Sequence, residues 1–380
     1  MSDLVVVGGG LAGAWAAVAG AQAGAKVTLV ARAPGATALY AGGMEIAPDL
    51  EAVLAEEPFH PFTRLYRDHL KLAADLEHVA QSLVAELGRA GLPVSGELRR
   101  PGRYPDLHGV PRRAQLVPAT VAPGELGSLR GQRVAIVAVE GVGDYDAEST
   151  AEALSEHGVK ATVARVPLKG LPPGAALGDL FGRSAPAVRS AADLVAYPPG
   201  FVKLPENGFE LLAAAPSPHG WRLQKALEGV LRRAGVEVVA GEVTGFRREG
   251  NRLLAALVGE TELSAGSFVL ATGRFIGGGL VKSRLVHEPL LDLAVYYQGE
   301  PIEDAYPRLR HLEYLDPAPA FRTGLLTDGE LRPVDVSGDP AFTNLRAAGS
   351  VLGGYDYGGG GCGFGVPLLT GWMAGRLAAR

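Results

Sequence analysis

Three glycines near the start of the chain constrain its fold more than any other feature. Residues 4–7 read LVVV, which predicts a short buried strand, and the small-residue stretch 11–25 predicts a helix. KVTLVAR, which follows, predicts a second buried strand. Between the first strand and the helix, Gly8, Gly10 and Gly13 keep a Gly-x-Gly-x-x-Gly spacing. This spacing lets the turn close tightly and brings a pyrophosphate to the helix N-terminus, so it predicts a dinucleotide site.

A second glycine-rich segment lies near the C-terminus. Residues 347–365 read AAGSVLGGYDYGGGGCGFG and contain the only cysteine of the chain, Cys362. Glycine in such quantity costs conformational entropy, so we interpret the segment as a place where a ligand needs close approach of the main chain. A terminal helix follows, with Pro367 in its first turn, where the missing N–H group costs nothing. We interpret Cys362 as a packing residue, with a redox thiol as the alternative.

A further α/β stretch lies in the middle of the chain. RVAIVAV at 133–139 predicts a buried strand, DAESTAEALSEHG at 146–158 an amphipathic helix, and KATVARV at 160–166 another strand. The turn EGVGDYD after the first of these strands has no third glycine at the required offset. We therefore interpret this stretch as the scaffold of an inserted domain and not as a second nucleotide site.

Three pieces together resemble the large flavoprotein class: the N-terminal glycines, the strand SFVLATG, and the AAGS strand before the terminal helix. That class splits its nucleotide domain across the chain and inserts a substrate domain. The resemblance predicts an α/β protein with a Rossmann-like FAD-binding fold, built as three layers around a parallel sheet. The expected parts are a flavin nucleotide-binding domain of residues 1–50, 205–285 and 335–380, an inserted α/β substrate or cap domain of residues 51–204, and a cap or connecting segment of residues 286–334.

The resemblance implies a noncovalent flavin held by main-chain groups of these pieces. A flat flavin ring needs edge contact with backbone N–H groups, and the helix that begins near Gly365 can direct its positive end toward the N1–C2 edge of the ring. For Gly42 and Gly43 an ordinary turn is the alternative, and Val243 is expected to contact adenine through its backbone. The expected cofactor-binding residues are Gly8, Gly10, Gly13, Arg32, Gly42, Gly43, Val243, Thr272, Gly273, Gly349, Ser350, Gly363 and Gly365.

One position departs from the usual FAD pattern. Such folds place Glu or Asp at the end of the second strand to hold the adenosine ribose, whereas this chain has Ala31-Arg32. The ribose contact is therefore missing or supplied otherwise, for instance by Arg32 stacking on adenine. We expect FAD because the pyrophosphate site is intact, and FMN is the alternative cofactor.

Two blocks of sequence resemble one particular family within the flavoprotein class. TGRFIGGGLVKSRLVHEPLLDLAV at 272–295, and GLLTDGELRPVD with NLRAAGSVLGGYDYGGGGCGFGV within 324–366, resemble the B subunit of anaerobic glycerol-3-phosphate dehydrogenase. The resemblance implies a protein that acts with a flavoprotein A subunit and an iron–sulfur C subunit to oxidise sn-glycerol 3-phosphate to dihydroxyacetone phosphate, with electrons passed to quinone. Two alternatives stay open. One is a self-sufficient flavin oxidoreductase for another small hydroxy or amino acid, and the other is a non-catalytic flavin-binding assembly or electron-relay subunit.

The implied substrate carries close to two negative charges on its phosphate, so its site needs arginine for bidentate contact. Arg222 in GWRLQ and Arg332 in ELRP are the candidates, and a surface ion pair is the alternative for each. Oxidising a secondary alcohol by hydride transfer also requires a base for the hydroxyl proton. His60 in FHPF is the candidate base, with a capping or core role as the alternative.

Composition excludes several other classes. The formal net charge of −5 argues against nucleic acid as the main partner. A single cysteine excludes a disulfide framework and a cysteine-ligated metal or iron–sulfur cluster within the chain, and we expect no metal site. No apolar run approaches the ~20 residues that span a bilayer, and the first residues lack the features of a signal peptide. We therefore expect a cytoplasmic protein whose only route to the inner membrane is through partner subunits.

Overall fold

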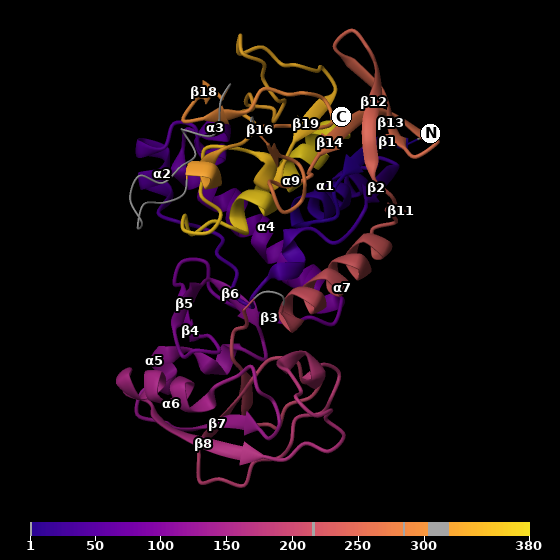
Figure 1. Cartoon of the computed structure of the whole chain (residues 1–380). Coiled ribbons are helices and arrows are strands. Elements are labelled where there is room, and N and C mark those ends of the chain that lie inside the picture. The colour runs from indigo at the N-terminus through magenta and orange to yellow at the C-terminus, as the bar shows by residue number, and fades with distance from the viewer. Residues whose placement is uncertain (1, 215–216, 284–285, 303–318) are drawn as a thin grey trace. The chain divides into compact units, whose positions relative to one another are not determined.

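The computed structural model describes residues 2–214, 217–283, 286–302 and 319–380, and the chain forms two units by its internal packing (Figure 1). Residues 303–318, within the connecting segment expected at 286–334, lie outside the described residues. Unit 1 comprises Met1–Thr37, Ile46–Glu86 and Ala226–Arg380, and unit 2 comprises Ala38–Glu45 and Leu87–Lys225.

Unit 1 is built on a seven-stranded sheet in the order β11-β2-β1-β14-β13-β12, with β19 also paired to β14. The strands β11, β2, β1, β14 and β19 run parallel, whereas β12 and β13 form an antiparallel hairpin that continues into the first half of β14. The strand bounds are β1 (Ser2–Val7), β2 (Val27–Ala31), β11 (Glu237–Ala240), β12 (Val243–Glu249), β13 (Arg252–Val258), β14 (Thr261–Leu270) and β19 (Leu345–Ala347). The mixed α/β fold with a parallel sheet, predicted from the chain ends, is confirmed.

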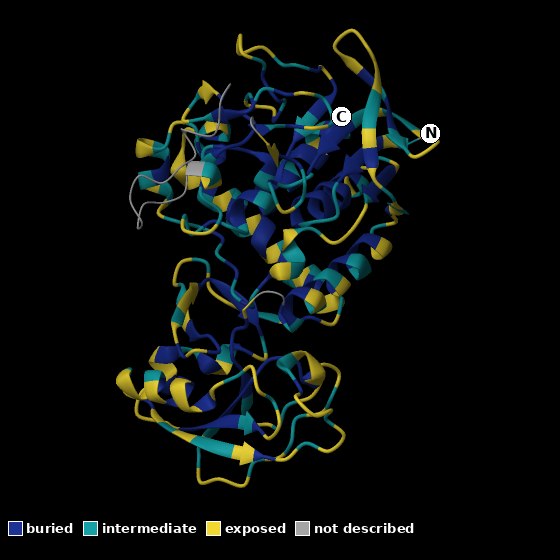
Figure 2. Cartoon of the chain, in the orientation of Figure 1, coloured by how far each residue is buried: buried dark blue, intermediate teal, exposed yellow. Residues whose placement is uncertain are grey.

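Two apolar helices from opposite ends of the chain pack against each other in unit 1 (Figure 1). They are α1 (Leu11–Gln22) and α9 (Gly365–Ala378). Figure 2 shows that the first of them is buried along nearly its whole length, which agrees with the burial of every residue from 11 to 20. A helix whose residues are mostly small and apolar on all sides is suited to such a buried position.

Residues 46–86 also belong to unit 1, although the sequence placed residues 51–204 in the insertion. They form α2 (Leu50–Glu56), α3 (Pro61–Leu65) and most of α4 (His69–Arg89). The segment packs on α9: the Tyr66 hydroxyl lies 3.6 Å from the Met373 sulfur, and the His78 ring meets the Trp372 ring edge-on with centroids 5.8 Å apart. No helix in the described ranges is both long enough and apolar enough to span a membrane.

Small elements complete unit 1. Two short pairs of antiparallel strands lie between β14 and β19 in sequence. Single 3₁₀ turns follow β2 and β19, and a third one ends at Arg322. These elements are β15 (Val281–Lys282) with β16 (Val286–His287), β17 (Tyr296–Tyr297) with β18 (Glu300–Pro301), η4 (Pro319–Arg322) and η5 (Gly349–Val351), while η1 (Ala36–Leu39) crosses into unit 2.

Unit 2 has its own parallel sheet, in the order β10-β9-β7-β8. The predicted strands at 133–139 and 160–166 are β7 (Arg133–Val139) and β8 (Lys160–Val166), and α6 (Ala147–Glu156) joins them after the N-cap Asp146. The remaining elements are β3 (Val94–Gly96), β4 (Gly102–Pro105), β5 (Pro111–Ala114), β6 (Leu116–Pro118), η2 (Ala122–Gly124), α5 (Leu126–Leu129), η3 (Leu177–Leu180), β9 (Leu194–Tyr197), β10 (Gly208–Glu210) and the first half of α7 (Pro218–Arg233).

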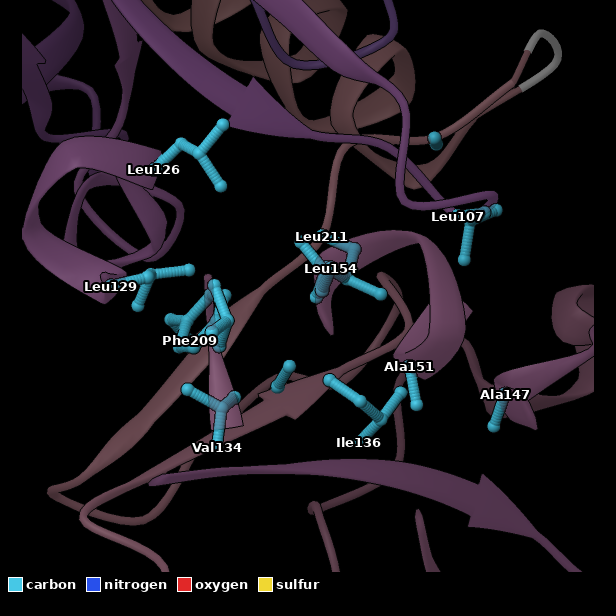
Figure 3. Close-up of a cluster of buried hydrophobic side chains, with 13 residues drawn as sticks. Leu107, Leu126, Leu129, Val134, Ile136, Ala147, Ala151, Leu154, Phe209 and Leu211 are labelled. Atoms are coloured by element: carbon cyan, nitrogen blue, oxygen red, sulfur yellow. The ribbon is translucent and has the colours of Figure 1, made fainter. Parts of the chain in front are cut away.

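Alternation along β7 explains how the unit 2 sheet buries both of its faces. Val134 and Ile136 point to one side, where they join a cluster with Leu154 of α6 and Phe209 of β10 (Figure 3). Ala135 and Val137 point to the other side, onto a second cluster that contains Tyr197. A strand buried on both faces reads as a continuous apolar run, which is how RVAIVAV reads in the sequence.

Candidate functional site

The carboxyl ends of β1, β14 and β19 meet at one edge of the unit 1 sheet. Val7 pairs with Leu270, and Leu270 pairs with Ala347, so the residues that follow these three strands are neighbours. The structure thereby brings together the fingerprint segment 8–13, the Thr272-Gly273 turn and the start of the C-terminal glycine-rich segment. In open α/β sheets, ligands bind at this carboxyl edge.

The turn from β1 into α1 needs glycine at two positions. Gly8 has φ +122°, and a Cβ on it would lie 2.2 Å from the Ala271 carbonyl oxygen. A Cβ on Gly13 would lie 1.9 Å from the Gly8 carbonyl oxygen, so α1 could not approach the strand so closely with any other residue. The N-cap of α1 is Gly10, which has no side chain to cap the helix. The Leu11 N–H group of the first turn already donates to the Thr37 hydroxyl at 2.9 Å. The other N–H groups of this turn and the positive dipole end of α1 are directed at the sheet edge, where they favour an anion.

Two further features at this edge suit a flavin nucleotide. The Thr272 hydroxyl is buried and has no hydrogen-bond partner among the described residues, so it is a polar group left for a ligand. The helix α9 begins at Gly365 after the N-cap Phe364, which also makes no side-chain cap. One helix N-terminus is thus suited to a pyrophosphate and a second to the electron-rich edge of a reduced flavin ring. The predicted bare amide at Gly349, however, already donates to the Thr370 hydroxyl at 2.9 Å.

Comparison with known proteins agrees with this arrangement. Residues 3–215 match the family model of the FAD binding domain. The chain is 30% identical to the B subunit of anaerobic glycerol-3-phosphate dehydrogenase from Yersinia enterocolitica, with 97% of this chain and 96% of that protein covered. It is 29% identical to the probable B subunit of the same enzyme from Halobacterium salinarum, with 100% and 98% covered.

The chain belongs to the family of B subunits of anaerobic glycerol-3-phosphate dehydrogenase. Its fold is also that of a solved 3-ketosteroid delta1-dehydrogenase from Sterolibacterium denitrificans, with a TM-score of 0.50 and 13% identity over 100% of this chain and 99% of that one. The FAD binding domain assigns FAD, and not the alternative FMN, as the cofactor of this B-subunit homologue, and places it among the flavin-dependent oxidoreductases.

The remaining predicted cofactor residues divide between the two units of the B-subunit homologue. Val243 is buried at the start of β12, and Ser350 and Gly273 are neighbours, since a Cβ on Gly273 would lie 3.5 Å from the Ser350 hydroxyl. Gly363 directly precedes the first turn of α9. Gly42 and Gly43 lie in unit 2, where the Tyr40 hydroxyl donates to the Gly42 carbonyl at 2.6 Å.

Arg222, a predicted phosphate contact, is engaged within unit 2. Its Nη1 donates to both carboxylate oxygens of Glu210 at 2.9 and 2.7 Å, and its Nη2 donates to the Phe201 carbonyl at 2.6 Å. Glu210 also accepts from the Thr120 hydroxyl and from the Gly200 N–H group. The Glu210 side chain is 0% exposed and that of Arg222 18%, so the pair is a buried ion pair and not the surface pair considered as the alternative.

Arg332 and His60, the other two predicted catalytic residues, also have protein partners. The Arg332 Nε lies 2.7 Å from an Asp328 carboxylate oxygen, in a turn that this carboxylate closes. His60 is the N-cap of α3, and its Nδ1 accepts from the Phe62 N–H group at 3.0 Å. Burial, with a smaller effect of Arg322, lowers the pKa of His60 to about 3. The ring is therefore neutral, and its Nε2 lies 3.6 Å from the Cys362 sulfur.

Arg274 is a site residue that sequence reasoning missed. It is 3% exposed and donates to the carbonyl oxygens of Ser350 (2.9 Å) and Leu352 (2.5 Å). Its guanidinium also lies 5.3 Å from the ring centroids of Tyr355 and Tyr357. Burial lowers the pKa of Arg274, an effect that the two tyrosines and Asp356 oppose. The arginine thus ties the glycine-rich segment to the end of β14, and its place directly after Thr272-Gly273 was the available signal.

Replacing Thr272 by valine tests whether its orphan hydroxyl serves the cofactor. Valine has nearly the same shape and breaks no hydrogen bond within the described part of the protein, so we expect the flavin-free protein to melt at the same temperature or slightly higher. FAD should bind about three- to tenfold more weakly, since a net hydrogen bond contributes about 0.5–1.5 kcal/mol. Fluorescence titration of FAD and thermal melting of the flavin-free chain measure both. Unchanged FAD affinity would show that the hydroxyl does not contact the cofactor.

Proposed function

We propose that this chain is the flavin-binding B subunit of a respiratory glycerol-3-phosphate dehydrogenase. The complex would oxidise sn-glycerol 3-phosphate to dihydroxyacetone phosphate and pass the electrons to quinone through a flavoprotein A subunit and an iron–sulfur C subunit. The observation that carries the proposal is end-to-end similarity to B-subunit proteins, at 30% identity over 97% of this chain and 96% of the relative. Such similarity extends through both units and is not confined to the nucleotide fold.

The unit 1 edge supplies what the proposal requires of the chain itself. The N-terminus of α1 would hold the pyrophosphate of FAD, the Thr272 hydroxyl and Ser350 would hold its polar midsection, and the N-terminus of α9 would face the ring. When bound, FAD supplies a two-electron acceptor for the hydride of a secondary alcohol. Because the chain has a single cysteine, it cannot ligate an iron–sulfur cluster alone, so electrons would leave through a partner.

A second candidate function is an electron-relay subunit in which the partner flavoprotein oxidises the substrate. It is favoured by the state of the three residues proposed for substrate chemistry. Arg222 and Arg332 form ion pairs with carboxylates, and the basic nitrogen of His60 accepts a hydrogen bond from a backbone N–H group. A neutral histidine whose lone pair is already used is a poor base for an alcohol proton.

The two functions are separated by the substrate-dependent loss of flavin absorbance near ~450 nm. The full chain loaded with FAD is mixed with glycerol 3-phosphate without oxygen, first alone and then with the co-expressed partner flavoprotein. Bleaching that requires the partner, followed by quinone reduction when the iron–sulfur subunit is added, is the expected result. Bleaching of the isolated chain by glycerol 3-phosphate would assign the oxidation to this subunit. Bleaching only by a different hydroxy or amino acid would overturn the proposal.

A further inference from the structure

The end of β2 lacks the carboxylate that usually holds the adenosine ribose, and the structure shows where one is supplied. β2 pairs in parallel with β11, with Ala31 opposite Ala240 and the Gly241 N–H group bonded to the Ala31 carbonyl at 3.1 Å. A charged residue follows each strand: Arg32 directly after β2, and Glu242 two residues after the end of β11. An acidic side chain therefore lies at the carboxyl edge, one strand over from the expected position.

Arg32 and Glu242 form an ion pair at this edge. Arg32 Nη1 lies 2.8 Å from Glu242 Oε1, with the side chains 61% and 55% exposed. Exposed ion pairs of this kind contribute little to the free energy of unfolding, so stabilising the fold is not the main effect of this pair. Its effect is geometric, because it holds the carboxylate beside β2 and leaves the second carboxylate oxygen, Oε2, without a protein partner in the described part of the chain.

We propose that Glu242 binds the ribose hydroxyls of the adenosine half of FAD, with Arg32 as the residue that positions it. A carboxylate accepts hydrogen bonds from vicinal ribose hydroxyls, which is the role that the acidic residue of β2 has in dinucleotide-binding folds. The fingerprint glycines are intact, so the pyrophosphate and ribose subsites would lie along one edge. This makes Glu242 a determinant of FAD over FMN, since only FAD carries the adenosine.

The test is a titration of the full-length, flavin-free chain with three ligands: FAD, FMN, and an FAD analogue whose adenosine lacks both ribose hydroxyls. We expect Glu242→Ala to weaken FAD binding about tenfold, because hydrogen bonds to a charged group are among the stronger ones. FMN binding should not change, and the analogue should bind the variant and the unmodified chain equally. Arg32→Ala should weaken FAD by a smaller factor, about threefold, because it removes only the support of the carboxylate.

Glu262→Ala is the matched control, because Glu262 forms a similarly exposed ion pair with Arg247 on the hairpin of the same unit, at 2.9 Å and 48% exposure on each side. It should leave all three affinities unchanged. Three results would each overturn the proposal. Glu242→Ala could bind FAD with full affinity, it could lose FMN and FAD affinity equally, or it could bind the FAD analogue without ribose hydroxyls tenfold more weakly than the unmodified chain does. A large loss in Arg32→Ala with none in Glu242→Ala would assign the contact to the arginine and overturn it also.

Discussion

Replacing Gly13 by alanine is expected to yield a chain that is purified without FAD and binds added FAD at least tenfold more weakly. The added Cβ would lie 1.9 Å from the Gly8 carbonyl oxygen and 3.0 Å from its carbonyl carbon, both backbone atoms that no side-chain rotation can move away. Helix α1 must therefore shift from the sheet or its first turn must unwind. Either change displaces the N–H groups that would hold the pyrophosphate. Flavin content after purification and FAD titration measure the effect.

Gly88→Ala is the control for this prediction. Gly88 lies near the end of α4 with nothing within 4 Å of an added Cβ, so alanine fits without displacement. Flavin content should stay the same, and stability should rise by about 0.5–1 kcal/mol because alanine loses less conformational entropy in a helix. If Gly13→Ala retains FAD at the level of Gly88→Ala, the pyrophosphate is not held at the start of α1.

Local patterns in the sequence predicted the elements that carry the cofactor site. The strand at 4–7 and the helix after Gly10 were readable because each has a strong apolar signal of its own and clear turn residues. The requirement for glycine at position 13 is equally local, since the contact that demands it is with the Gly8 carbonyl oxygen, five residues earlier. These are the parts of the fold in which neighbouring residues determine the geometry.

Other features depend on contacts between residues far apart in the chain. The amphipathic pattern of α4 shows that one face is buried but not against which element, so residues 51–86 were expected with the insertion although they pack in unit 1. The pairing of Arg32 with Glu242 depends on the parallel register of β2 and β11, which no local signal specifies. Arg274 was missed for a related reason, because its partners are carbonyl oxygens, which every residue possesses.

Replacing Arg222 by methionine is expected to destabilise unit 2 by about 3–5 kcal/mol, because it leaves the Glu210 carboxylate, whose side chain is 0% exposed, without its cation. The second change Glu210→Gln should recover much of this loss, since a neutral amide can still accept from the Gly200 N–H group. Urea-induced unfolding of the full chain, followed by circular dichroism, measures the difference. The exposed pair Arg133–Asp193 of the same unit is the control, and Arg133→Met should change little.

The pH dependence of this destabilisation has a definite sign. Burial raises the pKa of Glu210, but the charges of His219 and Arg222 and the hydrogen bonds from Arg222 and Thr120 outweigh it, so the pKa lies below the ordinary value. The carboxylate therefore stabilises the native chain above the unfolded pKa of about 4.3, and this contribution is lost as pH falls through the lower folded pKa. Arg222→Met removes the charge and the hydrogen bonds of Arg222 that lower this pKa, so the folded pKa of Glu210 rises and native Glu210 takes up a proton at a higher pH than in the unmodified chain. The destabilisation should therefore shrink as the pH falls from neutral toward the folded pKa of Glu210 in the variant, whereas a constant difference would mean that Arg222 acts through packing and not through its charge.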